Sequence, residues 1–152
     1  MTTEKYKFLE VRKLETLQKL ETWLLNGAYS KINMLTKSKN GSKTWKQLID
    51  SNIGIIYVAK DNNNFIGMIA GLLNPNLYNV EETDSFIAAI YIDDNYKEKG
   101  VGKTLFELFE KWSKLNKVTK ILAGIFLDSG KIFFEKQGFK ELQTILYKTI
   151  LE

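Results

Sequence analysis

Two glycines near the middle of the chain lie where backbone amides could bind an anion. Residues 97–104 read K-E-K-G-V-G-K-T and follow the apolar stretch 86–92 after a four-residue polar segment, D-D-N-Y. The first turn of a helix carries unpaired N–H groups at the positive end of the helix dipole. Gly100 and Gly102 leave room for close approach to these amides, and the neighbouring lysines add positive charge. The segment therefore predicts a site for a pyrophosphate.

Three kinds of phosphate-binding motif compete for this segment. A dinucleotide-binding turn needs G-x-G-x-x-G early in the chain, but Leu105 occupies the third glycine position. A Walker loop needs G-x-x-x-x-G-K-[ST], but Lys97 stands at its first glycine. The third pattern is a basic or amide residue, two residues, Gly, one residue, and Gly or Ala. Residues 97–102 match it.

The absence of two residue types restricts the chemistry. The chain has no Cys and no His, which excludes Ser-His-Asp, Cys-His and common zinc hydrolases. No metal site is predicted. Proton transfer would have to use carboxylates, tyrosines, hydroxyls, lysines or backbone amides.

Length and charge point to an ordinary globular protein. The 152 residues fit one domain, 1–152, with a formal charge of +4. Arg12 is the only arginine and lysines alternate with acids, so nucleic acid is not the expected partner. No apolar run approaches the roughly 18 residues of a membrane helix, and the N-terminus does not read as a signal peptide. We expect a cytoplasmic protein.

Hydrophobic periodicity gives the elements that must position the glycine turn. The expected helices are 14–24, 44–50, 101–115 and 129–136. The expected strands are 7–11, 54–59, 65–73, 86–92, 120–127 and 139–149. The apolar strand at 86–92 reads F-I-A-A-I-Y-I, as in a strand buried on both faces. The order predicts a mixed α/β sheet with helices on its faces.

Two ordered motifs resemble those of the GNAT family of N-acetyltransferases. Residues 97–102 resemble its motif A, and residues 131–141, K-I-F-F-E-K-Q-G-F-K-E, resemble its motif B. The resemblance implies a mostly antiparallel central sheet flanked by helices. It also implies acetyl transfer from acetyl-coenzyme A to a primary amine.

The resemblance assigns cofactor-binding roles to specific residues. The backbone of Ile90, Tyr91 and Ile92 would pair with the pantetheine arm, and the Ile92 N–H would face the acetyl carbonyl as an oxyanion donor. Ser129 would cap the following helix or touch the cofactor. The residues implied to hold the pyrophosphate are Lys97, Glu98, Lys99, Gly100, Val101, Gly102, Lys103 and Thr104.

The proton-transfer groups are less well defined. Phe134 stands where the family commonly has a tyrosine that protonates the departing thiolate, and phenylalanine has no proton to give. Tyr91 and Tyr147 are candidate replacements. The resemblance places Asp84, then Glu82 and Glu81, near the cleft as candidate bases or as acids that attract a cationic amine.

The remaining expectations concern partners. Residues 25–46 and 74–84 would recognise the acceptor, which is a small molecule, a peptide N-terminus or a lysine. Without Cys no acetyl-cysteine can form, so direct transfer in a ternary complex is favoured. Many family members are homodimers, but no segment here identifies an interface. The alternatives are a non-catalytic acyl-coenzyme A binding or partner-docking module and a nucleotide-phosphate binder.

Overall fold

The computed structural model describes residues 5–27, 41–76, 78–125, 128–143, 145, 146, 148 and 150. The strands are β1 (Lys7–Glu10), β2 (Gly54–Asp61), β3 (Asn64–Pro75), β4 (Thr83–Ile92) and β5 (Lys120–Ala123). The helices are α1 (Leu14–Asn26), α2 (Gly41–Asp50), α3 (Val101–Leu115), α4 (Asp128–Lys136) and the short 3-10 helix η2 (Asp94–Tyr96).

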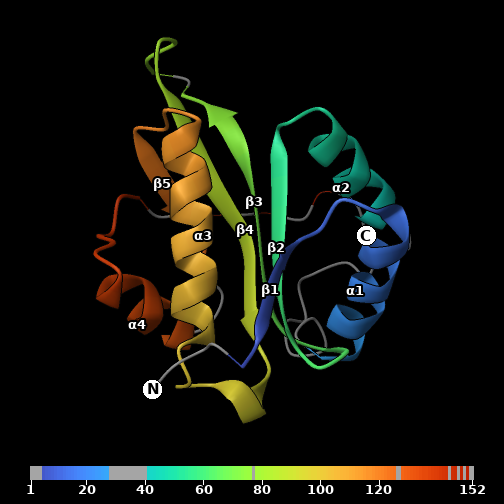
Figure 1. The fold of residues 1–152 in the computed structure, drawn as a ribbon. Coiled ribbons are helices and arrows are strands. Elements are labelled where there is room, and N and C mark those ends of the chain that lie inside the picture. Colours follow the sequence, from blue (N-terminus) through green and yellow to red (C-terminus); the bar gives the residue numbers. More distant parts are fainter. Residues whose placement is uncertain are drawn as a thin grey trace.

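The strands form one twisted sheet in chain order, β1-β2-β3-β4-β5 (Figure 1). Neighbouring strands are antiparallel except β4 and β5, which are parallel and joined through α3. A parallel pair needs such a crossover, because the chain must return to the same end of the sheet. The mixed, mostly antiparallel sheet with helices on both faces confirms the expected fold class.

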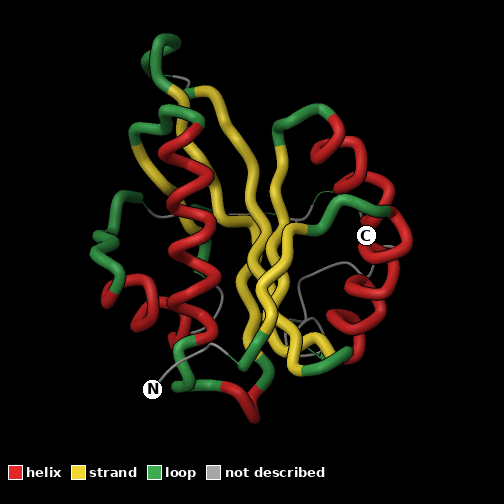
Figure 2. Tube along the Cα trace, viewed as in Figure 1, coloured by secondary structure: helices red, strands yellow, loops and turns green. Residues whose placement is uncertain are grey.

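The helices cover opposite faces of the sheet, each over its own hydrophobic core (Figure 2). On one side α3 buries Val101, Leu105 and Phe109 against the sheet. On the other side α1 and α2 bury leucines of the predicted stripe together with Ile49. The site described below lies where β4 passes between these two layers.

β4 is longer than its apolar stretch suggested. It begins at Thr83, where the sequence predicted a start at residue 86. The additional residues pair with the end of β3, up to Pro75↔Thr83. Because the ends of β3 and β4 pair with each other, the loop between them is shorter than the one expected over 74–84. By contrast, α3 has the predicted bounds.

The predicted closing strand at 139–149 is wrong for the residues that the structure describes. None of the described residues in this range is in a strand, and residues 144, 147 and 149 lie outside the described part. Leu142 and Leu146 are 66% and 88% exposed. An alternating pattern forms a strand only when a sheet edge pairs with it and buries one face, and here neither occurs. β5 likewise ends at Ala123, short of the predicted residue 127.

No helix in the described part of the chain is long and apolar enough to cross a membrane.

Candidate active site

A side-chain hydrogen bond joins the turn between β4 and α3 to the end of β2. Tyr96 donates its phenolic O–H to Oδ2 of Asp61 at 2.7 Å. This hydrogen bond, followed by desolvation, raises the pKa of the Tyr96 phenol above its ordinary value, so the donor keeps its proton at neutral pH. Asp93 Oδ1 accepts the Asn95 N–H at 3.0 Å within the same turn. These contacts fix where α3 begins.

The first turn of α3 presents backbone amides at the helix N-terminus. Glu98 and Gly100 adopt left-handed φ values of 62° and 83°, and only glycine does so without strain. The first helical hydrogen bond runs from the Thr104 N–H to the Gly100 C=O at 3.1 Å. The N–H groups between these residues have no acceptor inside the helix. Together with the helix dipole, they suit an anion.

Lysines surround this turn, as the sequence predicted. Nζ of Lys97 lies 2.9 Å from Oδ1 of Asp94, and Nζ of Lys103 lies 4.0 Å from Oε1 of Glu107. The Lys97 and Lys103 side chains are 54% and 68% exposed. Exposed ion pairs contribute only about 0–1 kcal/mol, so a bound anion could attract these ammonium groups. Lys99 places its Nζ 5.4 Å from the ring centroid of Tyr96.

Gly102 has a packing role that the sequence did not suggest. A Cβ on Gly102 would lie 3.1 Å from Cε1 of Phe133 on α4 and 3.5 Å from Cγ1 of Ile92. The missing side chain therefore lets α3 and α4 approach closely beside the end of β4. Figure 1 shows α4 beside the end of α3 at which that helix starts.

One edge of β4 is open beyond its midpoint. β5 pairs with β4 only from Asp84↔Lys120 to Ile87↔Ala123, so residues 88–92 have no strand partner on that side within the described chain. On the other side the Asp93 N–H donates to the Ile66 C=O at 2.8 Å. Backbone groups alternate along an antiparallel strand. The N–H groups of Ile90 and Ile92 therefore point toward the open edge.

A bulge separates the two halves of β4. The register with β3 shifts between Ala70 and Gly71, which pair with Ala89 and Ile87 and leave Ala88 without a partner. The ring of Phe109 lies over Gly71, which has no side chain to block it. A bulge bends its strand, so it helps β4 diverge from β5.

Comparison with known proteins decides the family. The sequence profile described as "Acetyltransferase (GNAT) family" matches residues 17–139. The chain belongs to this acetyltransferase family. No curated protein sequence matches the chain significantly.

Solved structures of acetyltransferases share the whole fold. An aminoglycoside acetyltransferase from an uncultured soil metagenomic sample, in complex with trehalose, is 17% identical with a TM-score of 0.78, covering 99% of both chains. A predicted acetyltransferase with acetyl-CoA from Clostridium acetobutylicum is 13% identical with a TM-score of 0.78, covering 95% of this chain and 96% of that one. AAC(6')-Iy in complex with the bisubstrate analogue CoA-S-monomethyl-acetylneamine is 14% identical with a TM-score of 0.74, covering 96% and 99%.

The acids predicted as bases lie at the opposite end of β4 from the GNAT turn. Asp84 is the second residue of β4 and Ile92 the last. With eight steps of about 3.3 Å each, they are separated by about 26 Å. The structure therefore does not bring Asp84 or Glu82 together with the Ile92 amide, and the general-base role of these acids stays a prediction. The exposed Glu81 belongs to the same loop.

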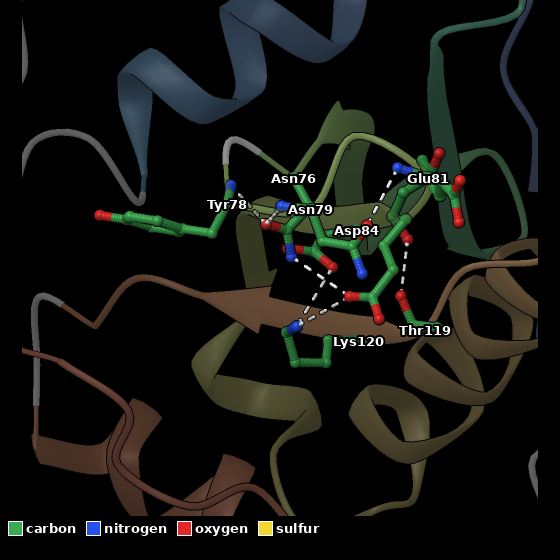
Figure 3. Close-up of polar contacts among 9 residues, drawn as sticks. Asn76, Tyr78, Asn79, Glu81, Asp84, Thr119 and Lys120 are labelled. Carbon is green, nitrogen blue, oxygen red and sulfur yellow. Dashed lines mark hydrogen bonds and ion pairs between the residues drawn. The ribbon is translucent and has the colours of Figure 1, made fainter.

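Asp84 instead joins a polar cluster that closes that end of the sheet (Figure 3). Nζ of Lys120 lies 3.7 Å from Oδ1 of Asp84 and 3.7 Å from Oε2 of Glu82. Asn76 Nδ2 donates to Oδ2 of Asp84 at 3.5 Å, while the Tyr78 ring points away from the cluster. Asp84 is only 5% exposed. Its contacts are those of a structural ion pair between β4 and β5.

The motif B phenylalanines face different surroundings. Phe134 is 3% exposed and its ring centroid lies 5.0 Å from that of Phe139 and 5.3 Å from that of Phe133. It is therefore a core residue in this structure. Phe133, beside Gly102 and Ile92, is the aromatic residue nearer the open edge.

The other predicted residues are placed as follows. Ser129 is exposed in the first turn of α4, one residue inside its start, so it does not cap the helix. The Tyr91 ring packs on Trp23 of α1 at 5.2 Å, on the face away from α3. Tyr147 and residues 28–40 of the expected acceptor segment lie outside the described residues.

Glu21 of α1 was not among the predicted site residues, although it lines the cavity between α1, α2 and the sheet. It lies four residues after Leu17 and three before Leu24. A charged residue at that spacing belongs to the apolar stripe itself. That interruption was the signal that could have identified it.

Proposed function

We propose that the chain transfers an acetyl group from acetyl-coenzyme A to an amine. The observation that carries this proposal is the continuity between two sets of unpaired backbone groups. The open edge of β4 presents the Ile90 and Ile92 amides, and it leads into the amides at the start of α3. A ligand with a diphosphate at one end and an amide-containing arm could use both.

The pyrophosphate would bind the turn from Lys97 to Thr104. The helix dipole and the exposed lysines favour its negative charge. The pantetheine arm would pair with the backbone of β4 along Ile90, Tyr91 and Ile92, in the space left by β5. Acetyl-coenzyme A supplies an activated acetyl thioester when it is bound there.

The backbone of β4 would stabilise the reaction. The N–H of Ile92, or of Ile90 on the same edge, donates to the acetyl carbonyl oxygen and stabilises the negative charge that develops there. The amine nitrogen forms the new bond to the carbonyl carbon as the bond to sulfur breaks. The thiolate departs, and the proton lost by the amine passes to solvent. Because the chain has no Cys, direct attack in a ternary complex is the route we propose.

The variant Lys103→Glu tests the pyrophosphate site. A carboxylate in the first turn gains from the helix dipole but loses the ion pair with Glu107 and repels it, so the stability of α3 should change little. Yet it should repel a pyrophosphate. We expect the Kd for coenzyme A, measured by calorimetry, to rise about tenfold, equivalent to about 1.4 kcal/mol. Lys111→Glu, an exposed change farther along α3, is the matched control and should leave the Kd unchanged.

Release of free thiol then tests the transfer itself. The wild-type protein with acetyl-coenzyme A and a panel of small amines, peptides and lysine-containing peptides should release coenzyme A faster than the hydrolysis background. Binding without amine-dependent release would indicate an acyl-coenzyme A binding module. An unchanged affinity in Lys103→Glu would contradict the pyrophosphate assignment.

A further inference from the structure

The hairpin formed by β2 and β3 contacts the turn before α3 at two points. The Asp93 N–H donates to the Ile66 C=O at 2.8 Å, and the Tyr96 phenol donates to Oδ2 of Asp61 at 2.7 Å. Asp61 is the last residue of β2, and Ile66 is the third residue of β3. Figure 1 shows the hairpin and the turn at the same end of the sheet. The position of the turn therefore depends on the hairpin as well as on its own local sequence.

Tyr96 joins the hairpin to a lysine of the turn. Its hydroxyl reaches Asp61, while Nζ of Lys99 lies 5.4 Å from the centroid of its ring. Tyr6 packs edge-on against the same ring, with the two centroids 5.7 Å apart. An ammonium group is attracted to the face of an aromatic ring. Contacts that orient the Tyr96 ring therefore also guide the charge of Lys99.

The turn that follows needs support from outside its own sequence. Glu98 has a φ of 62°, a left-handed value that is unfavourable for a residue with a side chain. The N–H groups at the start of α3 have no acceptor inside the helix, so they do not hold the turn in place. When a binding-competent conformation is only partly populated, the apparent Kd rises in proportion. An external contact that favours this conformation therefore raises the affinity for an anion.

We propose that Asp61 and Tyr96 form a positioning pair that holds the amides of residues 97–104 in their anion-binding arrangement, so that an acidic side chain promotes the binding of a diphosphate. This inference rests on the proposed function for the identity of that diphosphate, coenzyme A. Charge alone predicts the opposite effect, because a carboxylate repels a diphosphate. The sign of the change on removal of Asp61 therefore distinguishes positioning from simple electrostatics.

Two tyrosines in contact with each other provide a variant and its matched control. Tyr96→Phe keeps the ring and removes the hydrogen bond to Asp61. We expect the Kd for coenzyme A, measured by calorimetry, to rise about fivefold, as for the loss of one hydrogen bond. The Tyr6 hydroxyl is buried and has no hydrogen-bond partner among the described residues. Tyr6→Phe should therefore leave the Kd unchanged and the unfolding free energy unchanged or higher.

Substitutions of Asp61 separate its charge from its hydrogen bond. Asp61→Asn keeps an oxygen that can accept from Tyr96 and removes the charge, so the Kd should stay within about twofold of wild type. Asp61→Ala removes both, and its Kd should rise about fivefold, as in Tyr96→Phe. The double variant should bind no more weakly than either single variant, because both changes remove the same bond. Tighter binding by Asp61→Ala than by wild type would show that the carboxylate acts through its charge, and would overturn the inference.

Hydrogen exchange of the turn separates positioning from a general loss of stability. Without ligand, the amides of residues 97–104 should exchange faster in Tyr96→Phe and Asp61→Ala than in wild type, whereas those of residues 105–115 should not. Unchanged Kd values for coenzyme A in both variants would overturn this inference and leave the acetyl transfer standing.

Failure of the proposed function has a different outcome. If the wild-type protein does not bind coenzyme A, the proposed function fails, and the same variants are titrated with inorganic pyrophosphate. Weaker pyrophosphate binding in Tyr96→Phe, but not in Tyr6→Phe, would still support the positioning pair. Equal pyrophosphate binding in these two variants, or none in the wild type, would overturn it.

Discussion

The two halves of β4, residues 83–87 and 88–92, have different surroundings. Residues before the bulge pair with strands on both edges, and that end is closed by the ion pairs of Asp84 with Lys120. Residues after the bulge pair only with β3 in the described chain. The backbone groups of the first half therefore pair with neighbouring strands on both edges. In the second half, the N–H groups on one edge have no strand partner within the described chain.

Under the proposed function, this difference places the transfer site where strand pairing stops. In the proposed function, the functional groups of the open half are its backbone N–H groups. Polar side chains instead gather at the closed end, where they stabilise the sheet. In the proposed arrangement, the Asp84 ion pair and the transfer site lie at opposite ends of β4.

The largest effect is expected from Gly71→Ala, at the bulge between the halves. The new Cβ would overlap the Phe109 ring and lie 2.7 Å from the Phe86 carbonyl oxygen. We expect a loss of about 3 kcal/mol in unfolding free energy, as for overpacked cores, measured by urea denaturation. Coenzyme A affinity should also fall, because the bulge shapes the open edge. Gly130→Ala, with no neighbour closer than 3.8 Å, should be neutral or stabilising.

A smaller effect is expected from hydroxyls added to motif B. Phe134→Tyr would bury a hydroxyl in the core around Phe139 and should cost about 2 kcal/mol of stability. Phe133→Tyr adds the same hydroxyl beside Ile92 and Gly102, near the open edge, and should cost less. If a proton donor limits thiol release, Phe133→Tyr should accelerate it and Phe134→Tyr should not. Acceleration in Phe134→Tyr alone would place residue 134 at the open edge and contradict this arrangement.

Much of the fold could be predicted from the sequence where local signals and packing agree. The stripe that starts at Val101 after Gly100 gave α3 its observed bounds, because glycine ends one segment and the helical period begins the next. The positions of the first five strands along the chain followed from apolar runs and turn residues in the same way. The glycine turn and its flanking lysines lie where the sequence predicted, because both are local features of the chain; their cofactor-binding role belongs to the proposed function.

The features that were missed depend on contacts between distant residues. No turn residue marks the Ala88 bulge in the sequence, because the bulge results from the register with β3. Asp84 was expected near the cleft from the geometry that the family resemblance implies, and that expectation did not include its ion pair with Lys120 across the sheet. Nor does spacing alone reveal that Phe133 and Gly102 pack together.

The mildest change, Asp84→Asn, tests the closed end. Asparagine keeps the shape of the side chain and can still accept from Asn76, but the attraction to Lys120 is lost. Because the Lys120 side chain is 45% exposed, solvent screening should limit the loss of unfolding free energy to about 1 kcal/mol. Glu81→Gln, in the exposed turn before β4, should leave stability unchanged.

Measuring activity distinguishes a general-base role of Asp84 from a structural role. A general base contributes roughly a hundredfold or more to rate, so its removal should cause a large drop in kcat/KM for amine-dependent thiol release. A structural acid at the closed end should leave kcat/KM nearly unchanged at a temperature where the variant is fully folded. A hundredfold loss in Asp84→Asn would mean that the reacting carbonyl lies near the start of β4. The assignment of the transfer site to the open half would then have to be abandoned.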